Sequence, residues 1–252
     1  MRSRLKFAAL LACTLLGLPG LTGVPDARAQ SAEPKIVNVN GGGAVIQVLP
    51  GPAQFADSAA PIIAKMPPEK QQVMKMMGEN GPFSDRVAKI SGTFTGSFRD
   101  AGARGDSVAA TASFKTQDGA RWQVKLNRVA PEDESPMEPH WGGVATEIGY
   151  HGGTGIHAPL VPTVRSVVSY WGMSEVTRNG KLVTDQGPTH VMFTSDTRGE
   201  DFAYQCWICT DQPVRQLHLM LMPPEGKPYD VPGGILHVMW EDSKYRVSKA
   251  DR

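Results

Sequence analysis

The chain has 252 residues, of which 40% are hydrophobic and 20% are charged, with 26 basic and 25 acidic side chains. A chain of this length can bury a sizeable core in a single domain. The charges are balanced and form no basic block, so nucleic acid is not expected to be a partner.

Residues 1–29 have the pattern of an export signal. Basic residues precede an apolar stretch from Phe7 to Val24, and a small-x-small cleavage site follows at Ala27–Ala29. The stretch is short and interrupted by Pro and Gly, which favours cleavage over a membrane anchor. A lipoprotein box at Cys13 is a less favoured alternative. We expect a periplasmic or secreted mature chain that starts at Gln30 and has no membrane span.

Cleavage would remove four basic residues and one acidic residue. The remaining 22 basic and 24 acidic side chains give a net charge of −2. Residues 30–43 are polar and Gly-rich and predict a flexible lead-in. A strand is expected at 44–49. A short helix is expected at about 61–78, where Pro67-Pro68-Glu69 begins it and Gly78 ends it.

The rest of the chain has the texture of an all-β domain. Alternating or β-branched runs predict strands at 87–98, 107–114, 121–129, 164–170, 173–178, 181–184 and 201–206. Asn179-Gly180 is a strong type I′ hairpin signal. Short, closely spaced strands predict a mainly antiparallel β-sandwich or β-barrel with one short N-terminal helix, forming a single β-rich domain over 44–252.

Cleavage of the signal leaves two cysteines, Cys206 and Cys209, in the sequence Cys-Trp-Ile-Cys. In an oxidising compartment this spacing favours a disulfide. A redox or metal-thiolate role is the alternative. The surrounding sequence lacks the βαβ context of a thioredoxin-like site.

In the last quarter of the chain a His is followed three times by a Met two residues later. The pairs are His190 with Met192, His218 with Met220 and Met222, and His237 with Met239. In a strand, residues i and i+2 point to the same face. Imidazole and thioether donors together suit copper, above all Cu(I). Packing of these side chains in a half-buried face is the plain alternative.

We expect His218 and His237 to converge, because their strands are consecutive along the chain and consecutive strands are usually neighbours. His190 is the less certain member, because the segment with Cys206 and Cys209 intervenes.

The run from His218 to Met222, His-Leu-Met-Leu-Met, resembles the His-x-Met-x-Met segment of the periplasmic copper chaperones called PCuAC proteins. The resemblance covers these five residues. It implies a cupredoxin-like β-fold, Cu(I) as cargo, and His218 and Met220 as ligands. The family's upstream Met is not matched, because position 196 is Asp196.

A second local resemblance is to cupins. Pro232-Gly233-Gly234-Ile235-Leu236-His237 fits the Pro-x-Gly-x-x-His core of a cupin motif, which implies that His237 is a metal ligand in a double-stranded β-helix. The upstream His-x-His is missing, and Glu241 stands where the family has Asn.

A Gly-rich region carries the other three histidines, His140, His151 and His157. The glycines predict a tight loop, and the three histidines would line any ligand cavity that opens there.

Three functional hypotheses follow from these patterns. The first is an exported β-domain that captures and hands over Cu(I). The second is a cupin-like enzyme that uses a metal such as iron or manganese on a small organic substrate. The third is a metal-free interaction or ligand-carrier module. Metal ions or small molecules are the expected partners.

Overall fold

The computed structural model describes residues 33–52, 56–68, 71–72, 74–75, 78, 82–102, 105–130, 142–151, 160–224 and 227–250. The predicted signal peptide at 1–29, with Cys13, lies outside these residues, as do His140 and His157.

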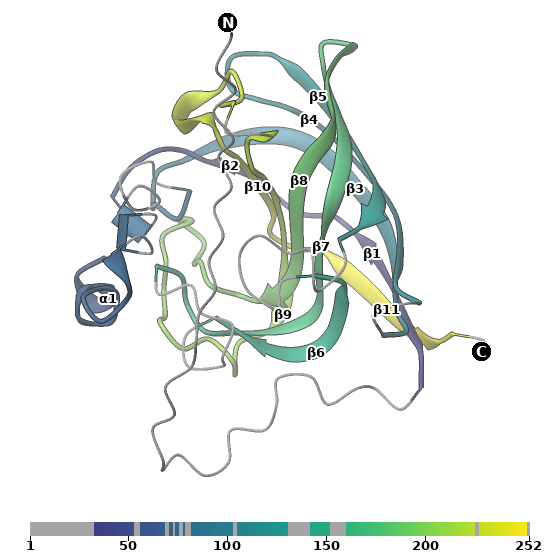
Figure 1. Cartoon of the computed structure of the whole chain (residues 1–252), viewed down its shortest axis with the longest axis horizontal. Helices are drawn as coiled ribbons and strands as arrows, with labels where there is room; N and C mark the ends of the chain where they lie inside the picture. The colour runs from purple at the N-terminus through teal and green to yellow at the C-terminus, as the bar shows by residue number, and fades with distance from the viewer. Residues whose placement is uncertain are drawn as a thin grey trace, which may run out of the picture.

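Eight strands form a closed antiparallel β-barrel, which confirms the predicted fold class (Figure 1). The order around the barrel is β3, β2, β10, β9, β8, β7, β5, β4 and back to β3. The strands are β2 (Val45–Val48), β3 (Val87–Asp100), β4 (Ser107–Lys115), β5 (Arg121–Val129), β7 (Val164–Arg178), β8 (Lys181–Ser195), β9 (Val214–Leu221) and β10 (Leu236–Trp240). Neighbours follow chain order from β2 to β10, with β6 outside the ring and β10 pairing with β2 to close it, unlike the two Greek keys of a cupin jelly roll.

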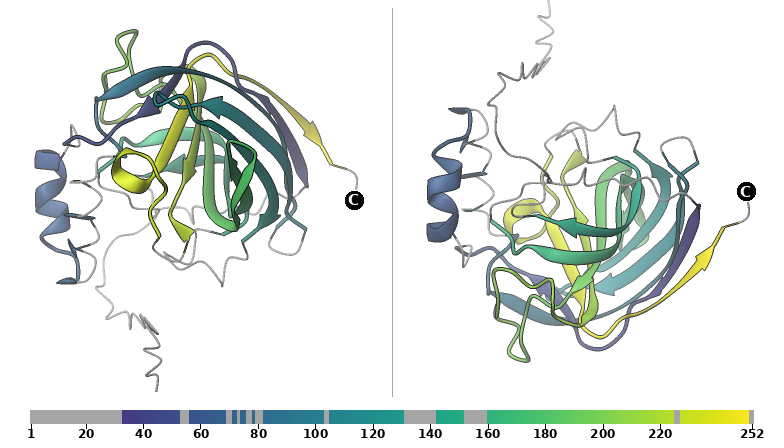
Figure 2. Two further views of the ribbon diagram at one scale, coloured as in Figure 1. Left: turned by 90° about the horizontal axis from the view of Figure 1, so that it is seen from above. Right: turned by 90° about the horizontal axis from the view of Figure 1, so that it is seen from below.

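Three further strands extend the sheet outside the barrel. β1 (Lys35–Asn40) pairs with both β3 and β11 (Lys244–Lys249). β1 and β11 lie side by side on one flank of the barrel (Figure 1). β6 (Val144–Tyr150) pairs with β7, next to the part of β7 that pairs with β5. α1 (Ala56–Ile63) lies on the flank away from β11 (Figure 2).

The barrel interior is filled by large apolar side chains from alternate positions of each strand. On β9 these are Leu217, Leu219 and Leu221, all fully buried. Phe94 and Trp240 lie in the same core with an edge-to-face ring contact at 5.6 Å. The residues between these interior positions face outward, and on β8, β9 and β10 they include the His-x-Met pairs.

Two pairs of predicted strands are each one long strand. The runs 164–170 and 173–178 join as β7, because Trp171 and Gly172 continue the pairing with β8. A Cβ at Gly172 would lie 2.0 Å from the carbonyl oxygen of Arg128 on β5, so only glycine fits there. The run 181–184 likewise continues through His190 as β8. Asn179 and Gly180 both have positive φ, as a type I′ turn requires.

Two local expectations were wrong. Lys35–Asn40 form β1 within the expected flexible lead-in, because Val37 and Val39 are fully buried against the sheet. The expected strand at 201–206 is a set of turns with one bridge, between Arg198 and Tyr204.

The helix α1 ends at Ile63, although the prediction placed the helix at 61–78. Turns occupy 64–66, and helical backbone returns at 68, 71–72, 74–75 and 78 among the described positions. In the described part of the chain no helix has the length and apolar character needed to cross a membrane.

Candidate functional site

Histidine and methionine alternate in two rows across β8, β9 and β10. The strand register places His190, Met220 and His237 in one row, and Met192, His218 and Met239 in the next. Each His therefore has a Met as its cross-strand neighbour. The His-x-Met pattern along each strand is repeated across the strands, because paired residues share a face.

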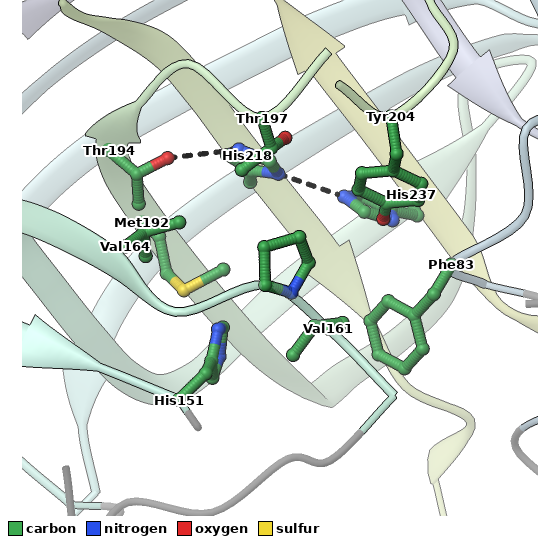
Figure 3. A pocket seen from close by; sticks show the side chains of 11 residues that line it. Phe83, His151, Val161, Val164, Met192, Thr194, Thr197, Tyr204, His218 and His237 are labelled. Carbon is green, nitrogen blue, oxygen red and sulfur yellow. Dashed lines mark hydrogen bonds between the residues drawn. The ribbon is translucent and has the colours of Figure 1, made fainter. Parts of the chain in front are cut away.

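The two rows lie on the outer face of the barrel, since Leu217, Leu219 and Leu221 on β9 fill the interior. They are nevertheless buried, with His218 7% and His237 3% exposed. Chain segments around residues 83, 160–164 and 197–204 cover them, as Figure 3 shows. This is a second apolar layer, separate from the barrel core.

His218 and His237 are in direct contact within this layer. Nδ1 of His218 lies 3.2 Å from Nε2 of His237, and Nδ1 of His237 lies 2.6 Å from the carbonyl oxygen of Pro82. A carbonyl oxygen can only accept, so Nδ1 of His237 carries the proton and Nε2 is an acceptor. His218 must then donate from Nδ1, and its Nε2 accepts from the Thr194 hydroxyl at 3.2 Å (Figure 3).

Burial keeps these imidazoles neutral. Desolvation lowers the pKa of His237 to about 4 and holds the pKa of His218 well below its usual value, which the neighbouring His237 lowers further. Neutral imidazole is the form that binds metal ions.

A small cavity of about 20 Å³ lies beside the two rings. That volume holds one water molecule or one metal ion. Its lining includes His151 and Met192 as well as His218 and His237, and these side chains border one space in Figure 3. The sequence placed His151 in a separate loop, but the structure brings it to the His-Met face, where burial lowers its pKa to about 3.

His151 follows β6 directly and has a φ of 64°, which is unusual for a residue with a Cβ. This conformation, together with a hydrogen bond between the ring and the backbone of Pro162, holds the imidazole over the His-Met face.

His190 lies on the same face but does not line this cavity. Its ring stacks on Trp171 at a centroid distance of 3.8 Å, and Nδ1 donates to the carbonyl oxygen of Tyr170 at 2.9 Å. Nε2 is buried, and within the described residues no hydrogen-bond donor reaches it. Burial lowers the pKa of His190 to about 3.

The other methionines of the pattern do not line the cavity. Met220 packs with Phe83 and Val161, and Met239 packs with Ile46 and Phe202. Met222 lies beyond the end of β9 and is only partly buried. Met192 is thus the one methionine that lines the cavity among the described residues.

No protein-family model, curated protein or solved structure matches this chain. What the site can do therefore follows from its own geometry. In the described part of the chain, no group of three or more His, Cys, Asp or Glu side chains is arranged to hold a metal ion. A metal bound by His218 and His237 would need a third donor of another kind, and the cavity offers the Met192 sulfur.

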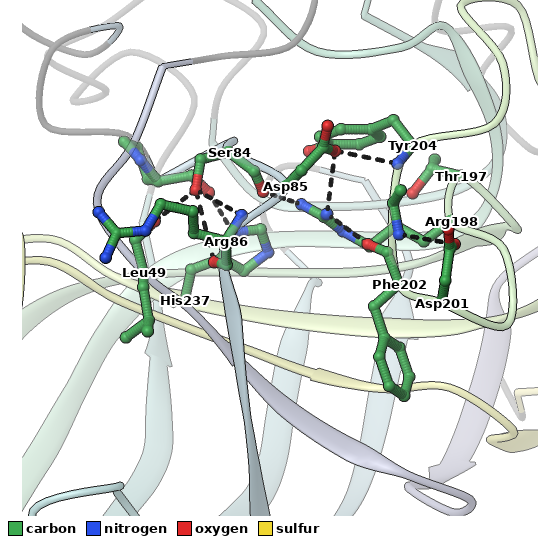
Figure 4. A network of polar contacts seen from close by, with 12 residues as sticks. Leu49, Ser84, Asp85, Arg86, Thr197, Arg198, Asp201, Phe202, Tyr204 and His237 are labelled. Carbon is green, nitrogen blue, oxygen red and sulfur yellow. Dashed lines mark hydrogen bonds and ion pairs between the residues drawn. The ribbon is translucent and has the colours of Figure 1, made fainter.

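A buried arginine fixes the segment that carries Pro82. Arg198 donates to the carbonyl oxygens of Ser84 at 2.9 Å and Phe202 at 2.8 Å, and its guanidinium stacks on the Tyr204 ring at 3.9 Å (Figure 4). The arginine thereby joins the segment before β3 to the segment after β8. Ser84 lies two residues after Pro82, whose carbonyl oxygen accepts from His237.

Cys206 and Cys209 have their sulfur atoms at disulfide-bonding distance, 1.95 Å apart. They pack in one apolar cluster with Met192 and Tyr150. The pair therefore lies next to the His-Met face, and no thiolate is available to a metal while the disulfide is formed.

Sequence reasoning missed Thr194, Pro82 and Arg198. Thr194 had a signal, since it continues the period-two series of His190 and Met192 by one more step. Pro82 and Arg198 had none, because they act through backbone carbonyls that only the folded chain brings near.

Proposed function

We propose that this protein is an exported β-barrel that binds a soft metal ion, Cu(I), on the outer face of β8–β10 for capture or hand-over. His218 Nδ1 and His237 Nε2 would be the two nitrogen ligands. Met192 would supply the sulfur, and the His151 ring borders the same cavity.

The separation of the two imidazole nitrogens carries this proposal. Two ligand nitrogens on one metal ion, with bonds of about 2.0 Å at a tetrahedral angle, are about 3.3 Å apart. The observed 3.2 Å matches that spacing, and small rotations of the two rings would turn both nitrogens from each other toward one metal ion. A metal ion would take the place of the hydrogen bond between them.

The outer partners of both rings also suit a metal. His237 keeps its Nδ1–H on Pro82. His218 needs only to move its proton from Nδ1 to Nε2, where the Thr194 oxygen can accept it, because a hydroxyl both donates and accepts. A histidine that binds a metal ion through one ring nitrogen usually donates a hydrogen bond from the other. No net proton has to be released.

The donor set favours Cu(I) over the metals of the enzyme hypothesis. A thioether is a poor ligand for iron or manganese and a good one for Cu(I). Iron or manganese would favour a carboxylate beside the imidazoles, and the described residues that line this cavity include no Asp or Glu.

The test is a Cu(I) titration of the purified, signal-free protein against a coloured Cu(I) chelator under anaerobic conditions. We expect competition at micromolar metal with one Cu(I) bound. His218→Ala and His237→Ala should each weaken binding at least tenfold, and Met192→Leu should weaken it less. Fe(II) and Mn(II) should not bind.

Met239→Leu is the matched control. It removes a thioether from the residue paired with His218, but Met239 packs against Phe202 outside the cavity. Cu(I) affinity should be unchanged. The proposal fails if the wild-type protein does not compete, or if Met239→Leu and Met192→Leu lose affinity equally.

A further inference from the structure

A second cavity lies at one end of the barrel, away from the histidines. Its volume is about 240 Å³, and it is lined by the end of β2, the β4–β5 turn and the loop before β10. The lining residues are Gln47, Leu49, Thr116, Gln117, Asp118, Val231 and Pro232. The cavity is large enough for a small organic molecule.

Gln47 is a polar residue on the interior face of the barrel. It is 2% exposed and pairs with Val238, whose side chain belongs to the barrel core. The side-chain oxygen of Gln47 is buried, and no donor in the described part of the chain reaches it. An unpaired buried acceptor destabilises a fold, so its presence beside a cavity points to a ligand that donates to it.

The charge beside this cavity indicates whether the donating ligand is neutral or positively charged. Asp118 is the charged residue among its lining side chains. Hydrogen bonds from Thr116 and Ala120 and the nearby Arg178 lower the pKa of Asp118, so it stays ionised. Arg178 pairs with Asp118 at 3.0 Å and with Asp230 at 2.6 Å, so two carboxylates share one guanidinium. The group has a net charge of −1 and favours a cation.

We propose that this end of the barrel binds a small organic ammonium compound. The ammonium N–H would donate to the Gln47 oxygen, the Asp118 side of the cavity would supply negative charge, and the apolar body would contact Leu49, Val231 and Pro232. This site shares no residue with the His-Met cavity, so it stands whether or not the protein binds copper.

The protein contains a reporter for this cavity. The Trp122 indole N–H donates to the Thr116 hydroxyl at 3.1 Å, and Thr116 lines the cavity. Occupation should shift the Trp122 indole resonance in ¹H–¹⁵N NMR spectra, where a Trp122→Phe variant assigns the peak.

The test titrates benzylamine, benzyl alcohol and benzoate, which share one apolar body. We expect benzylamine to shift the Trp122 resonance with a dissociation constant on the order of millimolar, as suits so small a molecule. Benzyl alcohol should bind at least tenfold more weakly, and benzoate should not bind. Benzoate that binds as well as benzylamine would overturn the proposal.

Three variants complete the test. Gln47→Leu should weaken benzylamine at least tenfold while its melting temperature stays equal to or above that of the wild type. Asp118→Asn, which keeps an acceptor for Ala120, should weaken benzylamine at least threefold and leave benzyl alcohol unchanged. Tyr229→Phe is the control, because its buried hydroxyl also lacks a partner among the described residues but does not line the cavity. Unchanged benzylamine binding in Gln47→Leu contradicts the proposal.

Discussion

His218 and His237 are diagonal neighbours across β9 and β10, with Nδ1 of one 3.2 Å from Nε2 of the other. Neither is directly opposite the other, because His218 pairs with Met239 and His237 pairs with Met220. Diagonal side chains on paired strands lie within reach when they are long or aromatic. The tautomers of both rings follow from one carbonyl oxygen, that of Pro82.

The metal-free protein should lose stability on acidification from pH 7 to pH 5. Burial lowers the pKa of His151 and His190 to about 3 and that of His237 to about 4, whereas unfolded histidines titrate near pH 6.5. Below pH 6.5 the unfolded chain therefore binds more protons than the folded chain, and the free energy of unfolding falls. Each such histidine contributes up to about 1.4 kcal/mol per pH unit.

Urea unfolding at several pH values measures this slope. His190→Phe should flatten it, because phenylalanine cannot be protonated. Phenylalanine keeps the stacking on Trp171 and removes the unpaired Nε2, and it loses the hydrogen bond to the Tyr170 carbonyl oxygen. An identical slope in this variant would show that His190 is not buried in its neutral form.

Glu241 should change the free energy of unfolding with pH in the opposite direction to the histidines, over the same pH range. Burial raises the pKa of Glu241 to about 7, although the side chain of Gln216 donates to its carboxylate at 2.6 Å. Between pH 4.5 and pH 7 the folded chain thus binds more protons at this residue than the unfolded chain. The free energy of unfolding therefore falls as the pH rises through this range, by on the order of 2 kcal/mol after solvent screening.

Glu241→Gln removes this term and keeps an oxygen for Gln216. The variant should be more stable than the wild type at pH 8 and equal to it at pH 4.5, as urea unfolding would measure. A variant that is less stable at pH 8 would mean that the charged carboxylate is favoured in the folded state.

Thr194→Val should destabilise the protein by about 1–3 kcal/mol, because Nε2 of His218 would be left buried without its donor. Thr194→Ser keeps the hydroxyl and should lose much less. The two variants are compared by chemical unfolding and by Cu(I) competition, where Val should also lower the affinity about 10–100-fold. Equal behaviour of Val and Ser would remove Thr194 from the hydrogen-bond chain.

Arg198→Met should be strongly destabilising, since each hydrogen bond from the guanidinium to a carbonyl oxygen contributes about 1.5–3 kcal/mol. The lost contacts are those to Ser84 and Phe202. Arg198→Lys should not restore stability, because one ammonium cannot reproduce the planar geometry that reaches both oxygens. Chemical unfolding at pH 7 measures both variants. Wild-type stability in Arg198→Met would show that the clamp does not hold the Pro82 segment.

The sequence by itself determined the all-β class, the shared face of each His-x-Met pair and the approach of His218 to His237. These follow from the period of two along a strand and from the tendency of consecutive strands to pair. The type I′ turn at Asn179-Gly180 was equally local, since it depends on residues that tolerate positive φ.

Only the tertiary structure decided which face the histidines occupy and what surrounds them. Both faces of β9 are apolar, so the pattern could not show that Leu217 and Leu219 point inward and His218 outward. The register across strands is set by pairing around the whole barrel. A slip of one residue would move every side chain of a strand to the opposite face of the sheet. His151 and Arg198 reach the site from distant segments because covering the outer face of β8–β10 removes apolar surface from water, and no local pattern encodes that contact.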